Sequence, residues 1–403
     1  MIDRILKTRE RNIYDYAFIG ASPAMIARAN YYSFLGKKVA LIDKYKELGG
    51  SWRLISPFKD GLRYDCLERY LAGGFQSKKI LREYGCQINT RTLIYLFKDN
   101  LRIFEKKMIF EIFKPKINYF QKMGKFTFLP ASEGEFIFLL RKGNIGKEEI
   151  KIYREKLKTI EGRKIRREAD VNLYFVENTD NLLKPLENRA IDYKVSIYKN
   201  TNVKKININT EFVKISGEFR NIFSSNVILG TYYNGKIFKN NREIKYKKNK
   251  DKRLTLLIRV YSKRKQKYKY IKFQGWKHIR ALQDVSSTNE PKNRSTFSLF
   301  LNPYERFAKE KDINYFFNLL KKLKILNDDS NIEKYYWYNY SYSKGIDSIK
   351  EKLLKIAHNK VTYLYISNLG IDIVKNPKIW RIALTKTSFI DKLTTYFKKR
   401  RFK

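Results

Sequence analysis

Histidine and cysteine are scarce in this chain, with two of each among 403 residues. Cys66 and Cys86 cannot form a disulfide framework for a protein of this size, which predicts a reducing compartment, here the cytoplasm. His278 and His358 leave little material for a histidine-rich metal site or a Ser/His/Asp triad. We therefore expect no bound metal, and we expect any chemistry to depend on a bound group rather than on a side chain.

Acidic residues are also few, because 40 Asp and Glu stand against 86 Lys and Arg and leave a formal net charge of +46. Such a charge ordinarily suits a nucleic acid, an anionic membrane or another polyanion. The basic residues are spread from Lys7 to Lys403, however, which favours a compositional bias over one binding patch. No zinc-finger spacing or RNA-recognition signature is present, so a polyanion-binding protein, or peripheral contact with an anionic surface, stays an alternative.

Long apolar runs are missing too, and the chain has no stretch of about 18 uncharged apolar residues that would predict a transmembrane span. Hydrophobic residues still make up 43% of the sequence and aromatic residues 15%, which is enough for a buried core. A chain of 403 residues exceeds the size at which one core stops growing. Two domains, or one large domain with a subdomain, are therefore expected.

The first forty residues have the pattern of a strand, a helix and a second strand. Tyr16–Ile19 is a short apolar run that enters a turn at Gly20, and Pro23 suits the first turn of a helix. Gly36 ends that helix, and Val39–Ile42 predicts a second buried strand. This order directs backbone N–H groups and the positive end of the helix dipole toward a pyrophosphate.

The turn resembles a dinucleotide fingerprint that has lost two of its three glycines. Gly20 keeps the role of the first glycine, whereas Ser22 and Met25 replace the second and third. Ser22 is small enough for a phosphate to approach, and Met25 requires a slightly wider gap between helix and sheet. Asp43 stands where a carboxylate accepts hydrogen bonds from the hydroxyls of an adenosine ribose.

Lys44–Trp52, with its Gly49-Gly50 pair, resembles the segment after the second strand in flavoproteins of the amine oxidase, protoporphyrinogen oxidase and UDP-galactopyranose mutase group. Two adjacent glycines give a loop without side chains that would obstruct a diphosphate. The resemblance implies FAD as the cofactor. The implied cofactor-binding residues are Gly20, Ala21, Ser22, Pro23, Ala24, Asp43, Lys44, Gly49, Gly50, Ser51, Trp52, Val203, Asn368 and Leu369.

Later segments resemble the same group more weakly. Val195–Ile206 is similar to the strand and turn that face the adenine, with Val203 in the contacting position. Val361–Gly370 and the helical pattern of Lys378–Leu393 are similar to the mutase-like turn from strand to helix, where Ser367 and Asn368 replace a glycine and an arginine. An ordinary β-meander, and a core strand followed by a surface helix, explain these two pieces about as well.

The expected fold class is α/β, with a discontinuous Rossmann-like FAD-binding domain and a second, mixed α+β substrate domain. The FAD-binding domain is expected in three segments, and a largely helical cap region and an antiparallel-sheet substrate domain separate them. In chain order the boundaries are 13–86 for the first FAD-binding segment, 87–194 for the cap region, 195–240 for the second FAD-binding segment, 241–344 for the sheet and 345–403 for the last FAD-binding segment.

The resemblance implies an FAD-dependent oxidoreductase that acts on a small-molecule or sugar-type substrate. Flavin chemistry needs no side-chain nucleophile, which agrees with the shortage of histidine. Arg63 and Arg280 are candidate active-site residues, because arginine binds carboxylate or phosphate through paired hydrogen bonds. The alternatives are a non-catalytic Rossmann-fold protein that has lost the cofactor, and the polyanion-binding protein described above.

Overall fold

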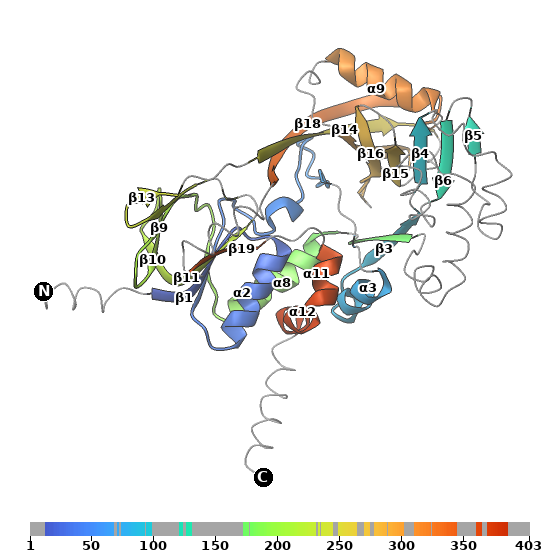
Figure 1. Ribbon diagram of the computed structural model, residues 1–403. Helices are drawn as coiled ribbons and strands as arrows, with labels where there is room; N and C mark the ends of the chain where they lie inside the picture. The colour runs from blue at the N-terminus through green and yellow to red at the C-terminus, as the bar shows by residue number, and fades with distance from the viewer. Residues whose placement is uncertain are drawn as a thin grey trace, which may run out of the picture.

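Two large β-sheets form the framework of the part of the protein that the computed structural model describes (Figure 1). The order of their strands shows that each sheet combines distant segments of the chain. The structure describes residues 13–67, 71, 74–92, 94–98, 121–123, 126–130, 172–176, 178–230, 233, 235–244, 249–263, 270–274, 278–287, 289–301, 310–323, 325–344, 360–364 and 369–385.

The centre of the nine-stranded sheet is parallel. Strand β1 (Ile13–Ile19) lies between β2 (Val39–Ile42) and β11 (Ile222–Gly230) and runs parallel to both. Strand β8 (Ser196–Tyr198) pairs with the far side of β2, and β19 (Val361–Leu364) pairs with β11, again in parallel. Three distant parts of the chain thus build one parallel sheet, whose carboxyl ends meet at one edge.

Four further strands continue this sheet beyond β11. They are β9 (Val203–Ile208), β10 (Val213–Gly217), β12 (Lys236–Lys239) and β13 (Arg242–Glu243). Their inward side chains, such as Ile206 and Ile215, join Ala17 and Ala40 of the central strands in one buried cluster. One face of the parallel strands is therefore covered by these strands.

Helices cover the other face of the parallel strands (Figure 1). Phe18 and Leu41 of the strands share a second buried cluster with Ile26, Leu186 and Trp380 of the helices. Because both faces are buried, the central strands read as continuous apolar runs rather than alternating ones. These helices are α2 (Pro23–Phe34), α3 (Gly74–Glu83), α8 (Asp180–Asp192), α11 (Leu369–Lys375) and α12 (Pro377–Leu384).

A buried ion pair ties the C-terminal helices to α2. The guanidinium of Arg28 donates to both carboxylate oxygens of Asp372, at 2.6 and 3.0 Å. Asp372 also accepts from the indole of Trp380 and the side-chain amide of Asn376, both at 2.9 Å. A paired and fully hydrogen-bonded carboxylate can be buried, so this contact fixes where α11 and α12 lie on α2.

The eight-stranded sheet is mostly antiparallel and has the strand order β18-β14-β17-β16-β15-β4-β6-β5. One exception is the parallel pair of β15 and β4. The bounds are β4 (Ile94–Lys98), β5 (Gln121–Met123), β6 (Phe126–Pro130), β14 (Asn249–Tyr261), β15 (Tyr270–Gln274), β16 (Ile279–Asp284), β17 (Arg294–Leu301) and β18 (Asn331–Lys344).

Strand β14 shows how this sheet is covered on its two faces. Leu256 and Ile258 pack with helix α9 (Glu310–Lys322), whereas Leu257, between them, packs with Tyr64 on the opposite face. Side chains alternate along a strand, so neighbours necessarily face opposite sides. The segment 53–67, which follows the Gly49-Gly50 loop, therefore lies against the face away from α9.

The α/β class expected from the sequence is confirmed, together with the strand Val39–Ile42 and the helix that begins at Pro23. Between residues 87 and 194 the structure differs from the largely helical expectation. Its described parts there contain β4, β5 and β6, the two-stranded pair β3 (Ile88–Thr92) and β7 (Asn172–Val176), and α8. Pairing across a sheet outweighs the local preference of such segments.

Helix α8 belongs to the range expected for the cap region, yet it packs on α2 in the layer that covers the parallel strands. The domain boundaries remain predictions. Among the described residues, no helix combines the length and the apolar character needed to cross a membrane.

Candidate functional site

The turn between β1 and α2 lies at the carboxyl edge of the parallel strands. Gly20 has a positive φ of 97°, and its N–H donates to the carbonyl of Ile42 at 2.8 Å. Ser22 is the N-cap of α2, but its hydroxyl makes no capping hydrogen bond. The positive end of α2 therefore faces this edge, and the hydroxyl of Ser22 is not used by the helix itself.

Asp43 holds this turn through its carboxylate. One oxygen accepts the N–H of Ala21 at 2.7 Å, and the other accepts the N–H of Tyr45 at 2.9 Å. Asp43 is only 3% exposed, and burial raises its pKa above the ordinary value, although both hydrogen bonds and the nearby Arg53 oppose this shift. Each carboxylate oxygen has two lone pairs, so Asp43 can brace the turn and also accept a ligand hydroxyl.

The Gly49-Gly50 loop packs directly on the same turn. The N–H of Gly49 donates to the carbonyl of Ala21 at 2.7 Å, and Gly50 begins the short helix η1 (Gly50–Trp52), which includes Ser51. A Cβ added to Gly50 would lie 3.3 Å from the backbone N of Ser22. Both glycines have positive φ, at 121° and 55°, so a side chain here would be strained and would fill the approach to the turn.

Met25 is buried beneath the helix, and a glycine of the neighbouring strand lies beside it. Met25 is 1% exposed and lies among the buried residues between α2 and the sheet. A Cβ added to Gly230, at the end of β11, would lie 3.9 Å from Cε of Met25 and 3.0 Å from the carbonyl oxygen of Ile19. This position of Gly230 was not predicted, because nothing in the local sequence shows that β11 lies beside β1.

Two cations flank the ring of Tyr45, next to Asp43. The guanidinium carbon of Arg53 is 3.7 Å from the ring centroid, and Nζ of Lys44 is 4.9 Å from it. Both positive charges lower the pKa of Asp43 in opposition to its burial. Arg53 was not among the expected site residues. Its position three residues after Gly50 could have identified it as a candidate, because that places a cation beside the glycine loop.

The structure also describes Pro23, Ala24, Val203 and Leu369 among the expected cofactor residues. Pro23 and Ala24 begin α2 and are buried. Val203 is buried at the start of β9 in the same cluster as Ile42, and Leu369 is buried at the start of α11 in the cluster that contains Ala24. Asn368 lies outside the described residues.

Arg63 and Arg280 lie in different surroundings. Arg63 forms ion pairs with Glu47 at 2.6 Å and with Asp180, at the start of α8, at 2.9 Å. Arg280 lies on β16, and its guanidinium carbon is 5.8 Å from the ring centroid of Phe300. Arg63 thus links the Gly49-Gly50 loop to α8, whereas Arg280 belongs to the eight-stranded sheet.

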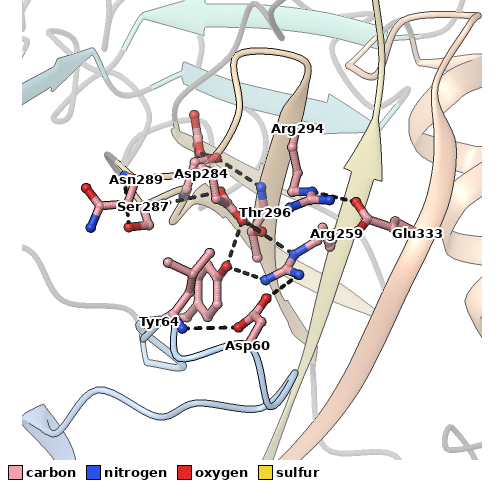
Figure 2. Close-up of polar contacts among 12 residues, drawn as sticks. Asp60, Tyr64, Arg259, Asp284, Ser287, Asn289, Arg294, Thr296 and Glu333 are labelled. Carbon is pink, nitrogen blue, oxygen red and sulfur yellow. Dashed lines mark hydrogen bonds and ion pairs between the residues drawn. The ribbon is translucent and has the colours of Figure 1, made fainter.

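A buried polar cluster fastens the segment 53–67 to the eight-stranded sheet (Figure 2). Arg259 of β14, 1% exposed, donates to the hydroxyl of Tyr64 and lies 2.5 Å from the carboxylate of Asp60. Tyr64 in turn donates to Glu290 at 2.7 Å, and Thr296 donates to the same oxygen at 2.6 Å. Burial, followed by the contact with Glu290, raises the pKa of Tyr64, so its hydroxyl keeps its proton.

Two backbone anchors support this attachment. The hydroxyl of Thr255 donates to the carbonyl of Cys66 at 2.9 Å, and that of Ser298 donates to the carbonyl of Asp65 at 2.6 Å. None of this cluster was predicted, because Arg259 interrupts an apolar strand and its partners lie far away in the chain. One connecting segment therefore joins the turn at the parallel sheet to the second sheet.

The residues at the carboxyl edge suit a nucleotide that contains a diphosphate. A helix N-terminus, a loop without side chains and a buried carboxylate surround one turn, and these groups recognise phosphate and ribose. Among the described residues, no group of three or more His, Cys, Asp and Glu side chains could hold a metal ion.

No protein-family profile matches the chain, and no curated protein matches it in sequence. Solved structures do match its fold. Cyclohexylamine oxidase from Brevibacterium oxydans IH-35A is 11% identical with a TM-score of 0.54, and the match covers 87% of this chain and 92% of the oxidase. Putrescine oxidase bound to putrescine is 11% identical with a TM-score of 0.55, over 94% of this chain and 99% of that one.

Reduced UDP-galactopyranose mutase is 10% identical with a TM-score of 0.54, and the match covers 87% of each chain. These similarities extend over both sheets, well beyond the Lys44–Trp52 segment that suggested them. The resemblance seen in the sequence is thus confirmed at the level of the fold, which this chain shares with amine oxidases and UDP-galactopyranose mutase.

Proposed function

We propose that this chain is an FAD-dependent oxidoreductase that acts on a small molecule. The observation that carries the proposal is the meeting of three features at one sheet edge: the N-terminus of α2, the carboxylate of Asp43 and the Gly49-Gly50 loop. In this proposal the parallel sheet and its helices are a Rossmann-like domain. The matches to an amine oxidase and the mutase extend over 87% of this chain, which supports a flavin rather than another nucleotide.

The chain's own residues would hold the cofactor by position and electrostatics. The backbone of Ala21–Ala24 and the start of α2 would bind the diphosphate, and Asp43 would accept ribose hydroxyls. Gly50 would let the diphosphate approach, and the hydroxyl of Ser22 would replace the contact of a lost glycine. The bound flavin would supply the transfer of a hydride or electrons.

We further propose that the eight-stranded sheet carries the substrate. Arg63 is already engaged with Glu47 and Asp180, so its proposed role is to position the loop. Arg280 stays the proposed contact for an anionic substrate. Val203, Asn368 and Leu369 stay proposed cofactor contacts. A cytoplasmic location is proposed because the chain has two cysteines among 403 residues, too few for a disulfide framework.

The visible spectrum of the purified protein tests this proposal. A flavin band near one FAD per chain, present on purification or regained on incubation with FAD, supports it. A colourless protein that gains no absorbance refutes it and favours the fold without its cofactor. If a polyanion is the partner instead, retention on an anionic polymer should fall steeply with salt and depend on residues 239–272.

Two glycine variants locate the site. Gly50→Ala adds both backbone strain and a Cβ 3.3 Å from Ser22 N, so FAD affinity should fall by about tenfold or more. Gly85→Ala is the matched control, because Gly85 also has a positive φ, at 81°, but no atom lies within 4 Å of an added Cβ. Equal effects of the two variants on FAD affinity would show that the cofactor does not lie at this loop.

A further inference from the structure

One consequence of the fold concerns the glycine that the turn has lost. In a fingerprint with three glycines, the third lies on the helix and lets helix and strand pack closely. Met25 takes this position here, yet it is buried and packed. The required space must come from a residue opposite the helix.

Gly230 is that residue. It ends β11, which pairs in parallel with β1, and Leu229 is the partner of Ile19 in the register. The Cα of Gly230 lies 3.8 Å from an added Cβ of Gly20, so the two glycines approach each other closely. Gly230 has no positive φ, so any requirement for glycine here is steric and not conformational.

An added side chain at this position would press on the turn itself. A Cβ at Gly230 would lie 3.0 Å from the carbonyl oxygen of Ile19, the residue that leads into Gly20. Atoms beyond that Cβ would meet Met25, whose Cε is 3.9 Å away. Packed interiors have little room to relax, so such contacts would shift the turn.

We infer that Gly230 is a positioning residue for the cofactor turn, and that it supplies from the strand the space that the lost glycine would have supplied from the helix. This inference rests on the proposed function, because it assumes that the turn holds the diphosphate of FAD. Gly230 acts through Ile19 and Gly20, and it needs no contact of its own with the cofactor.

Binding of FAD and ADP to the full chain tests the inference, because ADP contains the diphosphate without the flavin. Gly230→Ala should weaken both ligands by about tenfold, and Gly230→Val should weaken them further. Met25→Ala alone should leave both affinities nearly unchanged. The double variant Met25→Ala/Gly230→Val should recover part of the affinity lost by Gly230→Val, because the shorter side chain leaves room for valine.

Ser225→Ala, elsewhere on β11, is the control and should bind both ligands like the unaltered protein. Unchanged affinities in Gly230→Ala, or strictly additive effects of Met25→Ala and Gly230→Val, would overturn the inference. An unaltered protein that binds neither FAD nor ADP would refute the proposed function and with it the cofactor role of Gly230. The same double-variant cycle, followed by urea unfolding, would then still show whether Met25 and Gly230 form one packing unit.

Discussion

Removing the guanidinium of Arg259 would leave a carboxylate buried without a counter-charge. The side chains of Arg259 and Glu290 are both 1% exposed, and Nε of the arginine lies 3.4 Å from Oε1 of the glutamate. Breaking a buried pair by removing one partner typically costs about 3–5 kcal/mol. Asp60 adds little to this cost, because its side chain is 26% exposed and water can solvate it.

Urea unfolding of the Arg259→Met variant measures this cost. Total stability is typically about 5–15 kcal/mol, so the variant should unfold at a clearly lower urea concentration and, for a chain of 403 residues, roughly 4–6 °C lower on heating. Glu290→Gln serves as the second variant, because glutamine keeps an oxygen that accepts from Tyr64 and Thr296. The double variant Arg259→Met/Glu290→Gln contains no unpaired charge at this position.

The comparison of these variants decides whether the burial of an unpaired carboxylate causes the loss of stability in Arg259→Met. The double variant should be more stable than Arg259→Met, because the second change removes the unpaired carboxylate. A loss below about 1 kcal/mol in Arg259→Met, or a double variant whose loss equals the sum of the single losses, would refute the reasoning.

Three further predictions concern Asp43, Arg63 and Asp372. Burial raises the pKa of Asp43, so its contribution to stability is present at low pH and is lost as pH rises through the folded-state value. Unfolding measured from about pH 3 to pH 7 should therefore show the unaltered protein losing stability relative to Asp43→Asn as pH rises, and a constant difference would contradict this. Arg63→Gln removes two partly exposed ion pairs and should lower the free energy of unfolding by at most about 1 kcal/mol in urea titration. Asp372→Asn leaves Arg28 poorly paired and should speed hydrogen exchange in α11 and α12 more than in α9, whereas equal exchange in these helices would contradict the assigned role of the pair.

The elements predicted well from the sequence are those that local chemistry determines. Pro23 suits the first turn of a helix, and Val39–Ile42 is uniformly apolar because both of its faces are buried. The strands between residues 87 and 194 were not predicted, because their pairing depends on distant partners. Ile94–Lys98, for example, pairs with β15, almost 180 residues later in the chain.

The candidate site also combines residues that the local sequence predicts with residues whose roles depend on distant partners. The fingerprint turn, Asp43 and the two glycines lie within about thirty residues, so their spacing alone suggested that they meet. Gly230 and Arg259 acquire their roles from strands brought together from distant segments. Arg259 in particular would be expected on the surface, since a buried arginine requires partners that only the folded chain supplies.

The pairing of Arg28 with Asp372 also has a consequence for the synthesis of the chain. The two residues are 344 positions apart. At roughly 5–20 residues per second, a ribosome would take on the order of 20–70 seconds to travel between them. For most of that time the first strand, helix and strand would lack β19 and the C-terminal helices, and α2 would expose the apolar surface that those helices cover. A nascent chain of this protein therefore provides a long interval for chaperone binding, and that interval ends only when α11 and α12 leave the ribosome.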